Sequence, residues 1–201
     1  MGRTERSLSV ASIAIPATIV VAWVVVSLVH TGGLQFFIRN QALVRYGGVT
    51  AERLVAGEWW RLIVSQFLHV YLLHALLNAA AILVIGSQLE RIVSTWRFLV
   101  TYFVCGIAGQ IVAVAMTPMV VATGASQAAL GISAAAIVIA IQQKKRSLLA
   151  AAVAYTAIQI ILDLVFAHRL KPPHLSSFGL GLLLALCWLS WARAPENFPG
   201  S

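Results

Sequence analysis

Apolar residues fill the chain in six long runs, and short polar or charged stretches separate them. A helix needs about 20 apolar residues to cross the bilayer core, and each run approaches or exceeds that length. The first run follows Arg3 and Arg6 but is too long for the apolar part of a secretory signal, so we interpret it as a retained helix. The pattern predicts transmembrane spans at about residues 8–30, 64–88, 98–117, 124–142, 147–166 and 174–192.

The segment 31–63 is the one long connection between these spans, and it is not simply polar. It mixes arginines and glycine pairs with aromatic and aliphatic residues, among them Phe36, Phe37, Trp59 and Trp60. Such a mixture is typical of structure that lies among lipid headgroups. We therefore predict a membrane-interface loop at 31–63 within a single membrane domain that covers residues 1–201.

Composition supports this picture, because 60% of the residues are hydrophobic and only 10% are charged. With a mean hydropathy of +0.90, the chain does not fit a soluble globular domain, a disordered chain or a nucleic-acid module. Cys105 and Cys187 both lie inside apolar runs, so neither a disulfide framework nor a cysteine metal site is supported. The fold class predicted is an all-α membrane protein, a bundle of six transmembrane helices.

The net charge of +8 arises mainly from basic residues at the ends of the apolar runs, where they set orientation. Six alternating spans put both termini on one side of the membrane. The positive-inside rule favours a cytoplasmic location for both, since a cluster of three cations lies in one very short turn. We expect the membrane to be the plasma membrane. The inner set is Arg3, Arg6, Arg91, Arg97, Lys144, Lys145, Arg146 and Arg193. The outer set is Arg39, Arg45, Arg53, Arg61, Arg169 and Lys171.

Polar side chains within the predicted spans are few, and each one is a candidate functional residue because it is costly in lipid. This topology places Ser126 and His174, each at the start of its span, toward the outer leaflet. His74 and Asn78 lie in the first half of the second span and reach the same depth. Three helices thus bring a hydroxyl, two imidazoles and a carboxamide to one shallow layer.

Spacing within the second span separates these residues further. His74 and Asn78 are four residues apart and share a helix face, whereas His69 and His74 are five apart and do not. This spacing argues against a paired-histidine metal site. Gly124 and Gly131 flank Ser126, and small residues follow His174, so the helices that carry them can approach closely.

These residues are the parts of an acyl-transfer site. Serine becomes nucleophilic when a base takes its proton, and imidazole is the natural base near neutral pH. The Ser126 backbone N–H, Asn78 and His74 could donate hydrogen bonds to a tetrahedral oxyanion. Since no aspartate is adjacent to His174 in sequence, a dyad is the simplest interpretation.

From Trp59 to Gly181 the chain resembles the rhomboid intramembrane serine proteases. The matching elements are the Trp60-Arg61 pair, the stretch FLHVYLLHALLN, the stretch GSQLE, Gly124-Ala125-Ser126 with Gly131, and His174 with Gly181. The resemblance implies a Ser126 nucleophile, a His174 base and acid, and an oxyanion hole of His74, Asn78 and Ser126. It gives structural or supporting roles to Trp60, Arg61, His69, Glu90, Gly124, Gly131 and Gly181.

The resemblance also implies an endopeptidase that cuts single-span transmembrane proteins near the outer leaflet without a cofactor or metal. The partners expected are such substrates and the lipid bilayer, with no nucleic acid; the oligomeric state is left open. Segment 31–63 would be the embedded first loop, braced by Arg61, and Glu90 would lie at the inner end of the second span. The fifth span and the loop before His174 would form a lateral gate.

Several alternatives stay open. Gln127 stands where the family usually has glycine after the serine, and Ser177 replaces another small glycine, so an inactive rhomboid-like protein that binds transmembrane helices is the main rival. Asp163 is expected to face water near His168, with orientation of His174 as its second interpretation. A proton-coupled transporter would predict inverted repeats, and a metalloprotease would predict H-E-x-x-H; the sequence shows neither.

Overall fold

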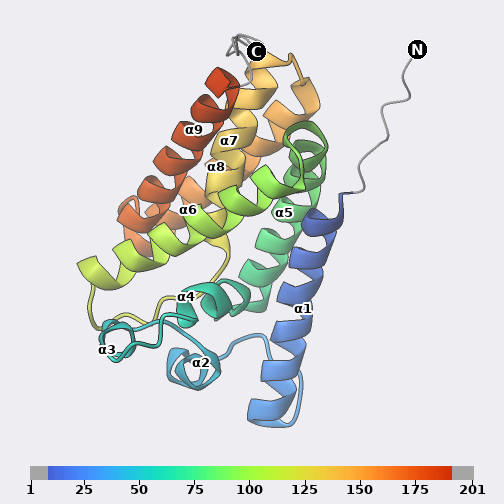
Figure 1. Cartoon of the computed structure of the whole chain (residues 1–201). Helices are drawn as coiled ribbons and strands as arrows, with labels where there is room; N and C mark the ends of the chain where they lie inside the picture. The colour runs from blue at the N-terminus through green and yellow to red at the C-terminus, as the bar shows by residue number, and fades with distance from the viewer. Residues whose placement is uncertain (1–8, 192–201) are drawn as a thin grey trace, which may run out of the picture.

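Six apolar helices form the bundle that the computed structural model shows for residues 9–191 (Figure 1). Five of them are long and apolar enough to cross a membrane, and the sixth, α7, is a shorter apolar helix. Helices suit this setting because every backbone group bonds within its own segment where no water is present. Their bounds are Val10–Thr31 (α1), Leu72–Val93 (α5), Thr95–Met116 (α6), Ser126–Gln142 (α7), Arg146–Ala167 (α8) and Pro172–Trp191 (α9).

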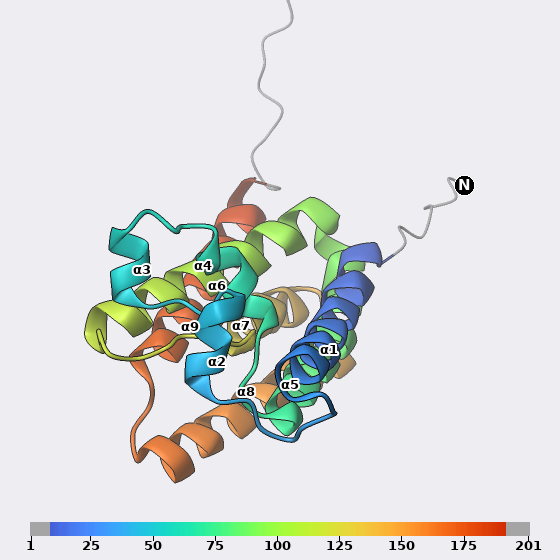
Figure 2. The same ribbon diagram turned by 90° about the horizontal axis from the view of Figure 1, so that it is seen from below.

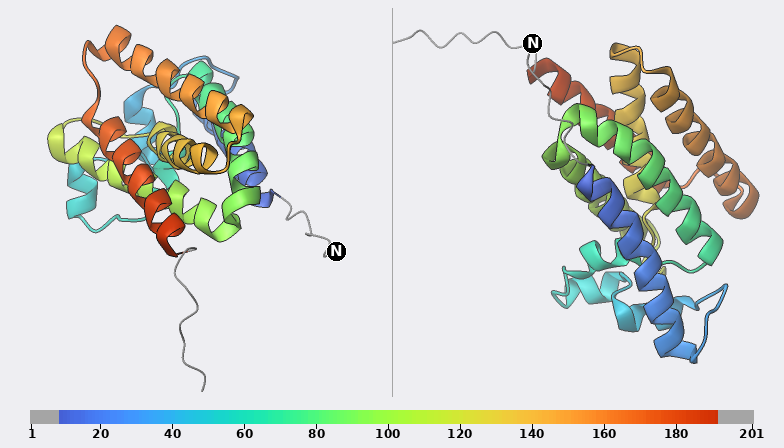
Figure 3. Two further views of the ribbon diagram at one scale, coloured as in Figure 1. Left: turned by 90° about the horizontal axis from the view of Figure 1, so that it is seen from above. Right: turned by 90° about the vertical axis from the view of Figure 1, so that its right-hand side faces the viewer.

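Helix α7 lies in the middle of the bundle, in contact with α5, α6, α8 and α9 (Figures 2 and 3). Of its 17 residues, 13 are buried, which the alanine-rich, small-residue sequence of this helix permits. Its 17 residues span about 25 Å, less than the roughly 30 Å of a bilayer core. The start of α7 is buried inside the protein, where Ser126 is only 5% exposed.

Segment 31–63 folds into short helices at the lower end of the bundle in Figure 1. They are α2 (Asn40–Tyr46) and α3 (Ala51–Val55), followed by α4 (Arg61–Val64) and the 3-10 turn η1 (Ser65–Phe67). Phe36, Trp59 and Trp60 are exposed, whereas Ile38 and Leu43 join the core.

The prediction for the second span, 64–88, is wrong at both ends, because the helix runs from Leu72 to Val93. Residues 68–71 are extended and pair with the first loop: the Ile38 N–H donates to the Val70 carbonyl, and the Leu72 N–H donates to the Phe36 carbonyl. His69 therefore lies before the helix, and a helical angle between His69 and His74 has no meaning; their rings are 5.9 Å apart.

The other predicted spans lie within a few residues of the observed helices. Arg3, Arg6 and Arg193 from the predicted inner set fall outside the described residues. Between residues 9 and 191 there is no β-strand, only two isolated bridges, Phe37 with Tyr71 and Val49 with Ala122.

Glu90, near the end of α5, forms hydrogen bonds with the start of α1. Its buried carboxylate accepts hydrogen bonds from the Ala11 and Ser12 N–H groups, at 3.2 and 2.9 Å, and from the Thr95 hydroxyl at 2.8 Å. The first N–H groups of a helix have no partners within the helix, so this carboxylate acts as a cap supplied by α5.

Candidate active site

Ser126 and His174 meet although 48 residues separate them in sequence. The Ser126 Oγ lies 3.1 Å from the His174 Nε2, and both residues are buried. Each lies in the first turn of its helix, α7 or α9. Two prolines begin α9, and proline is well suited to that position because its φ is already helical and its missing N–H has no partner there. The rigid first turn of α9 thus fixes the position of His174 at the start of this helix.

Asp163 is the third member of this arrangement, and the expectation that it faces water near His168 is wrong. It is only 2% exposed, and its Oδ2 lies 2.8 Å from the His174 Nδ1. The same oxygen accepts the Lys171 N–H at 3.1 Å, and the Lys171 ammonium lies 3.3 Å from Oδ1. Because a short loop brings the end of α8 next to the start of α9, a residue 11 positions earlier reaches the histidine.

His69 forms a hydrogen bond with Ala125, the residue before the serine. Its Nε2 lies 3.2 Å from the Ala125 N–H and 3.0 Å from the Asn78 Nδ2. A backbone N–H can only donate, so Nε2 must be an acceptor, which leaves the ring proton on Nδ1. His69 thus ties the extended segment before α5 to the start of α7.

Asn78 is part of a buried polar cluster with α8. Its Oδ1 accepts hydrogen bonds from the Tyr155 hydroxyl at 2.7 Å and from the Gln159 Nε2 at 3.2 Å. Within residues 9–191, no hydrogen bond joins Asn78 or the half-buried His74 to Ser126. Asn78 keeps a second amide hydrogen beyond the one it gives His69.

The loop before α7 is pinned from three sides. Val49 and Ala122 exchange two backbone hydrogen bonds, and the Gly124 N–H donates to the Ser65 carbonyl at 2.9 Å. The Gln110 amide on α6 donates to the Gly124 carbonyl. Gly124 has φ +109°, which side-chain-bearing residues rarely adopt, so glycine is required here by the backbone conformation.

Gln127 is buried beside the serine, and its Oε1 lies 3.3 Å from the Ser126 Oγ. Gly109 on α6 makes room for it: a Cβ at Gly109 would stand 2.6 Å from the Gln127 Cβ and would also strike the Ser177 hydroxyl. The two positions that depart from the family pattern therefore pack over the same glycine. The larger Gln127 and Ser177 side chains are accommodated rather than forced onto the nucleophile.

Arg61 braces the first loop from within. Its guanidinium donates to the Val44 and Gly48 carbonyls at 2.6 and 3.1 Å, pairs with Glu58 and lies 4.7 Å from the centre of the Trp60 ring. Hydrogen bonds from Arg53 and Arg61 lower the pKa of Glu58 below its ordinary 4.5.

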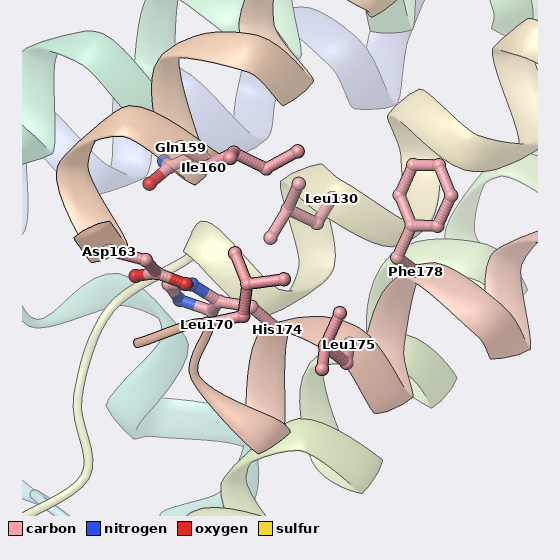
Figure 4. Close-up of a pocket in the computed structure, with 8 residues that line it drawn as sticks. All are labelled: Leu130, Gln159, Ile160, Asp163, Leu170, His174, Leu175 and Phe178. Carbon is pink, nitrogen blue, oxygen red and sulfur yellow. The ribbon is translucent and has the colours of Figure 1, made fainter. Parts of the chain in front are cut away.

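A cavity of about 40 Å³ opens beside Asp163 and His174, between α8 and α9. Figure 4 shows Asp163 and His174 at one side of it, with apolar side chains around the rest. This volume admits a water molecule or a small group. The lining residues are Leu130, Gln159, Ile160, Asp163, Leu170, His174, Leu175 and Phe178.

Sequence reasoning missed Tyr155 and Gln159 as polar neighbours of Asn78. The signal was present, because Tyr155, Gln159 and Asp163 recur every four residues and form one polar stripe on a mostly apolar helix. Among residues 9–191, no group of three or more His, Cys, Asp or Glu is placed to hold a metal ion.

The fold and the buried polar groups define a multi-pass helical membrane protein with a recessed serine and histidine. Residues 56–191 match the model of the rhomboid domain, and the chain belongs to the rhomboid family.

Three relatives illustrate the similarity. The chain is 33% identical over 106 residues to rhomboid protease GluP of Bacillus subtilis (strain 168), covering 53% of this chain and 21% of that protein. It is 37% identical over 93 residues to rhomboid-like protease 3 of Toxoplasma gondii, covering 46% and 35%. It is 26% identical over 115 residues to rhomboid protease AarA of Providencia stuartii, covering 50% and 41%. The matches thus span less than half the length of each relative.

Proposed function

We propose that this protein is an intramembrane serine endopeptidase that cleaves single-span transmembrane proteins near the outer leaflet. The observation that carries the proposal is the 3.1 Å contact between the Ser126 Oγ and the His174 Nε2 at the recessed start of α7. The names of the relatives, which are proteases, agree with it.

In the proposed reaction, the Ser126 Oγ attacks the carbonyl carbon of the scissile peptide while its proton passes to the His174 Nε2. The tetrahedral intermediate collapses as the C–N bond breaks, and the Nε2 proton goes to the leaving amine. Water then attacks the Ser126 acyl ester and gives a proton to Nε2. Release of the carboxyl product returns that proton to the serine oxygen, so the enzyme is regenerated.

The developing oxyanion requires donors that are already in place. The first-turn N–H groups of α7 have no acceptor within the helix, and the Ser126 N–H is one of them. We assign the remaining donors to His74 and to the second amide hydrogen of Asn78. His69 forms hydrogen bonds with both Asn78 and Ala125, and would thereby hold the Asn78 amide near the serine.

A fluorophosphonate probe on detergent-purified protein tests this function without knowledge of the substrate. Wild type should be labelled, and Ser126→Ala and His174→Ala should not. Ser133→Ala is the matched control, because Ser133 is a buried serine on the same helix, and it should label like wild type. Cleavage of a single-span reporter in proteoliposomes would follow the same order.

The rival function is a helix-binding protein without activity, and Gln127 is the residue that favours it, since its Oε1 competes with His174 for the one hydroxyl proton. Absence of labelling in folded wild type that persists in Gln127→Gly would support this rival. Recovery of labelling in Gln127→Gly would instead identify Gln127 as the residue that masks a competent site.

We also propose that the active-site end faces outward and that both termini are cytoplasmic, in the plasma membrane. With Cys105 and Cys187 replaced, Gly33→Cys in the first loop should react with a membrane-impermeant maleimide on intact cells. Gln143→Cys, at the opposite end of α7, should react only after permeabilisation. The reverse pattern would refute this orientation.

A further inference from the structure

The contact between Asp163 and His174 extends the site beyond a dyad. Three groups lie in a row: the Ser126 Oγ is 3.1 Å from the His174 Nε2, and the His174 Nδ1 is 2.8 Å from the Asp163 Oδ2. All three residues are buried. We propose that Asp163 is a positioning residue, which fixes the tautomer of His174 and stabilises its charged form during the reaction. The inference rests on the proposed function and deepens it.

The tautomer follows from the identity of the acceptor. An ionised carboxylate can only accept, so a hydrogen bond to Asp163 places the His174 ring proton on Nδ1. Nε2 is then the free base, and it is the nitrogen that faces the serine. A neutral histidine without this partner populates both tautomers, and the one with its proton on Nε2 cannot take the Ser126 proton.

The charge of Asp163 matters at the moment when His174 becomes an imidazolium. A carboxylate in contact with the ring favours its charged form, and this contact is out of water, where the attraction is less screened. Lys171 moderates the effect, because its ammonium lies 3.3 Å from the other carboxylate oxygen and is itself 43% exposed. The groups that face His174 are Asp163 of α8, Lys171 of the connecting loop, Ser126 of α7 and His74 of α5.

This placement also joins the base to a helix that lines the cavity. Asp163 is on α8 and His174 is on α9, and the cavity opens between these two helices (Figure 4). The contact between Asp163 and His174 thus joins the end of α8 to the start of α9 at one side of this cavity.

A purely structural role for Asp163 is the competing explanation, since its Oδ2 also accepts the Lys171 N–H ahead of α9. Asp163→Asn separates the two roles. The asparagine side chain has the same shape, and its oxygen still accepts hydrogen bonds. The hydrogen bond from the Lys171 N–H ahead of α9 therefore survives, but the negative charge is lost. Thr156→Val is the matched control, because Thr156 is on the same helix and its hydroxyl bonds only to the Ala152 carbonyl.

The first measurement reads the tautomer of His174 from the ¹⁵N-imidazole NMR signals of the purified protein, with His174 assigned by difference from His174→Ala. In wild type, the neutral His174 should carry its proton on Nδ1. In Asp163→Asn, whose amide can also donate to Nδ1, part of the population should carry the proton on Nε2 instead. Thr156→Val should show the wild-type tautomer.

The second measurement is the rate of fluorophosphonate labelling as a function of pH. Asp163→Asn should label at least about 100-fold more slowly at its plateau, in line with the losses seen when such an acid is neutralised in serine hydrolases. Asp163→Glu, which keeps the charge, should recover part of the rate.

The NMR and labelling measurements together distinguish a failure of this inference from a failure of the proposed function. If folded wild type is not labelled, the proposed function fails, and the NMR measurement of the tautomer still decides whether Asp163 governs His174. If wild type is labelled but Asp163→Asn matches Thr156→Val in rate and tautomer, the inference is overturned and the proposed function stands.

Discussion

Gly181 of α9 lies directly against the backbone of Gly131 of α7, so close that a Cβ on Gly181 would strike the Gly131 carbonyl. Gly131 in turn faces the Cys105 side chain of α6. These contacts let α9 approach α7 closely enough for His174 to reach Ser126. The two glycines thus set the helix separation that the candidate site requires.

Substitution of Gly181 should therefore be far more damaging than substitution of its neighbour Gly179. Gly181→Ala would push against backbone, which cannot move aside, and overpacking of this kind costs about 1–3 kcal/mol or more. A Cβ at Gly179 meets nothing within 4 Å, so Gly179→Ala should be neutral or slightly stabilising. Thermal unfolding in detergent measures both, and equal melting temperatures would contradict the close approach.

Gly109→Ala should lower both stability and probe labelling, because the new methyl group meets Gln127 and Ser177. Gln127 is adjacent to the nucleophile, so its displacement disturbs Ser126. Adding Gln127→Gly to Gly109→Ala removes one of these obstacles, and the double variant should regain part of the lost stability. A double-mutant cycle on the unfolding free energy should give a coupling of about 0.5–3 kcal/mol. Simple additivity would show that Gly109 does not accommodate Gln127.

Removal of the Glu90 carboxylate should loosen α1. Glu90→Ala leaves the Ala11 and Ser12 N–H groups and the Thr95 hydroxyl without their acceptor, and hydrogen bonds to a charged group contribute about 1.5–3 kcal/mol each. We expect a loss of several kcal/mol in the unfolding free energy, with Glu52→Ala on the surface helix α3 as the control. Limited proteolysis should cut α1 sooner in Glu90→Ala alone.

The first loop should become less stable in acid through Glu58. The pKa of this carboxylate is lowered, first by its hydrogen bond with Arg53 and then by that with Arg61. A lowered folded-state pKa means that the stabilisation is complete above the ordinary value of 4.5 and is lost as the pH falls through the folded-state value. Glu58→Gln should melt below wild type at pH 7 and converge with it at pH 3. A difference that persists unchanged in acid would assign the effect to shape rather than charge.

Hydrophobic runs were sufficient to predict most of the fold. Five of the six spans were found from length and hydropathy alone, since lipid admits few alternatives to an apolar helix. The start of the second span was wrong because Leu68 and Val70 continue the apolar pattern ahead of the helix. The backbone groups of residues 68–71 instead pair with residues 36–38, a long-range choice that local hydropathy does not record.

The sequence by itself determined which residue types are available for the candidate site. A serine and a histidine at the starts of two spans stand out because polar groups are costly in a membrane. Only the tertiary structure decided how they are arranged. It directs Asn78 toward His69 and α8, places Gln127 over Gly109, and brings Asp163 onto His174. The reason is that periodicity tells which face of one helix a residue occupies, whereas the rotation and separation of neighbouring helices depend on small-residue contacts between distant parts of the chain.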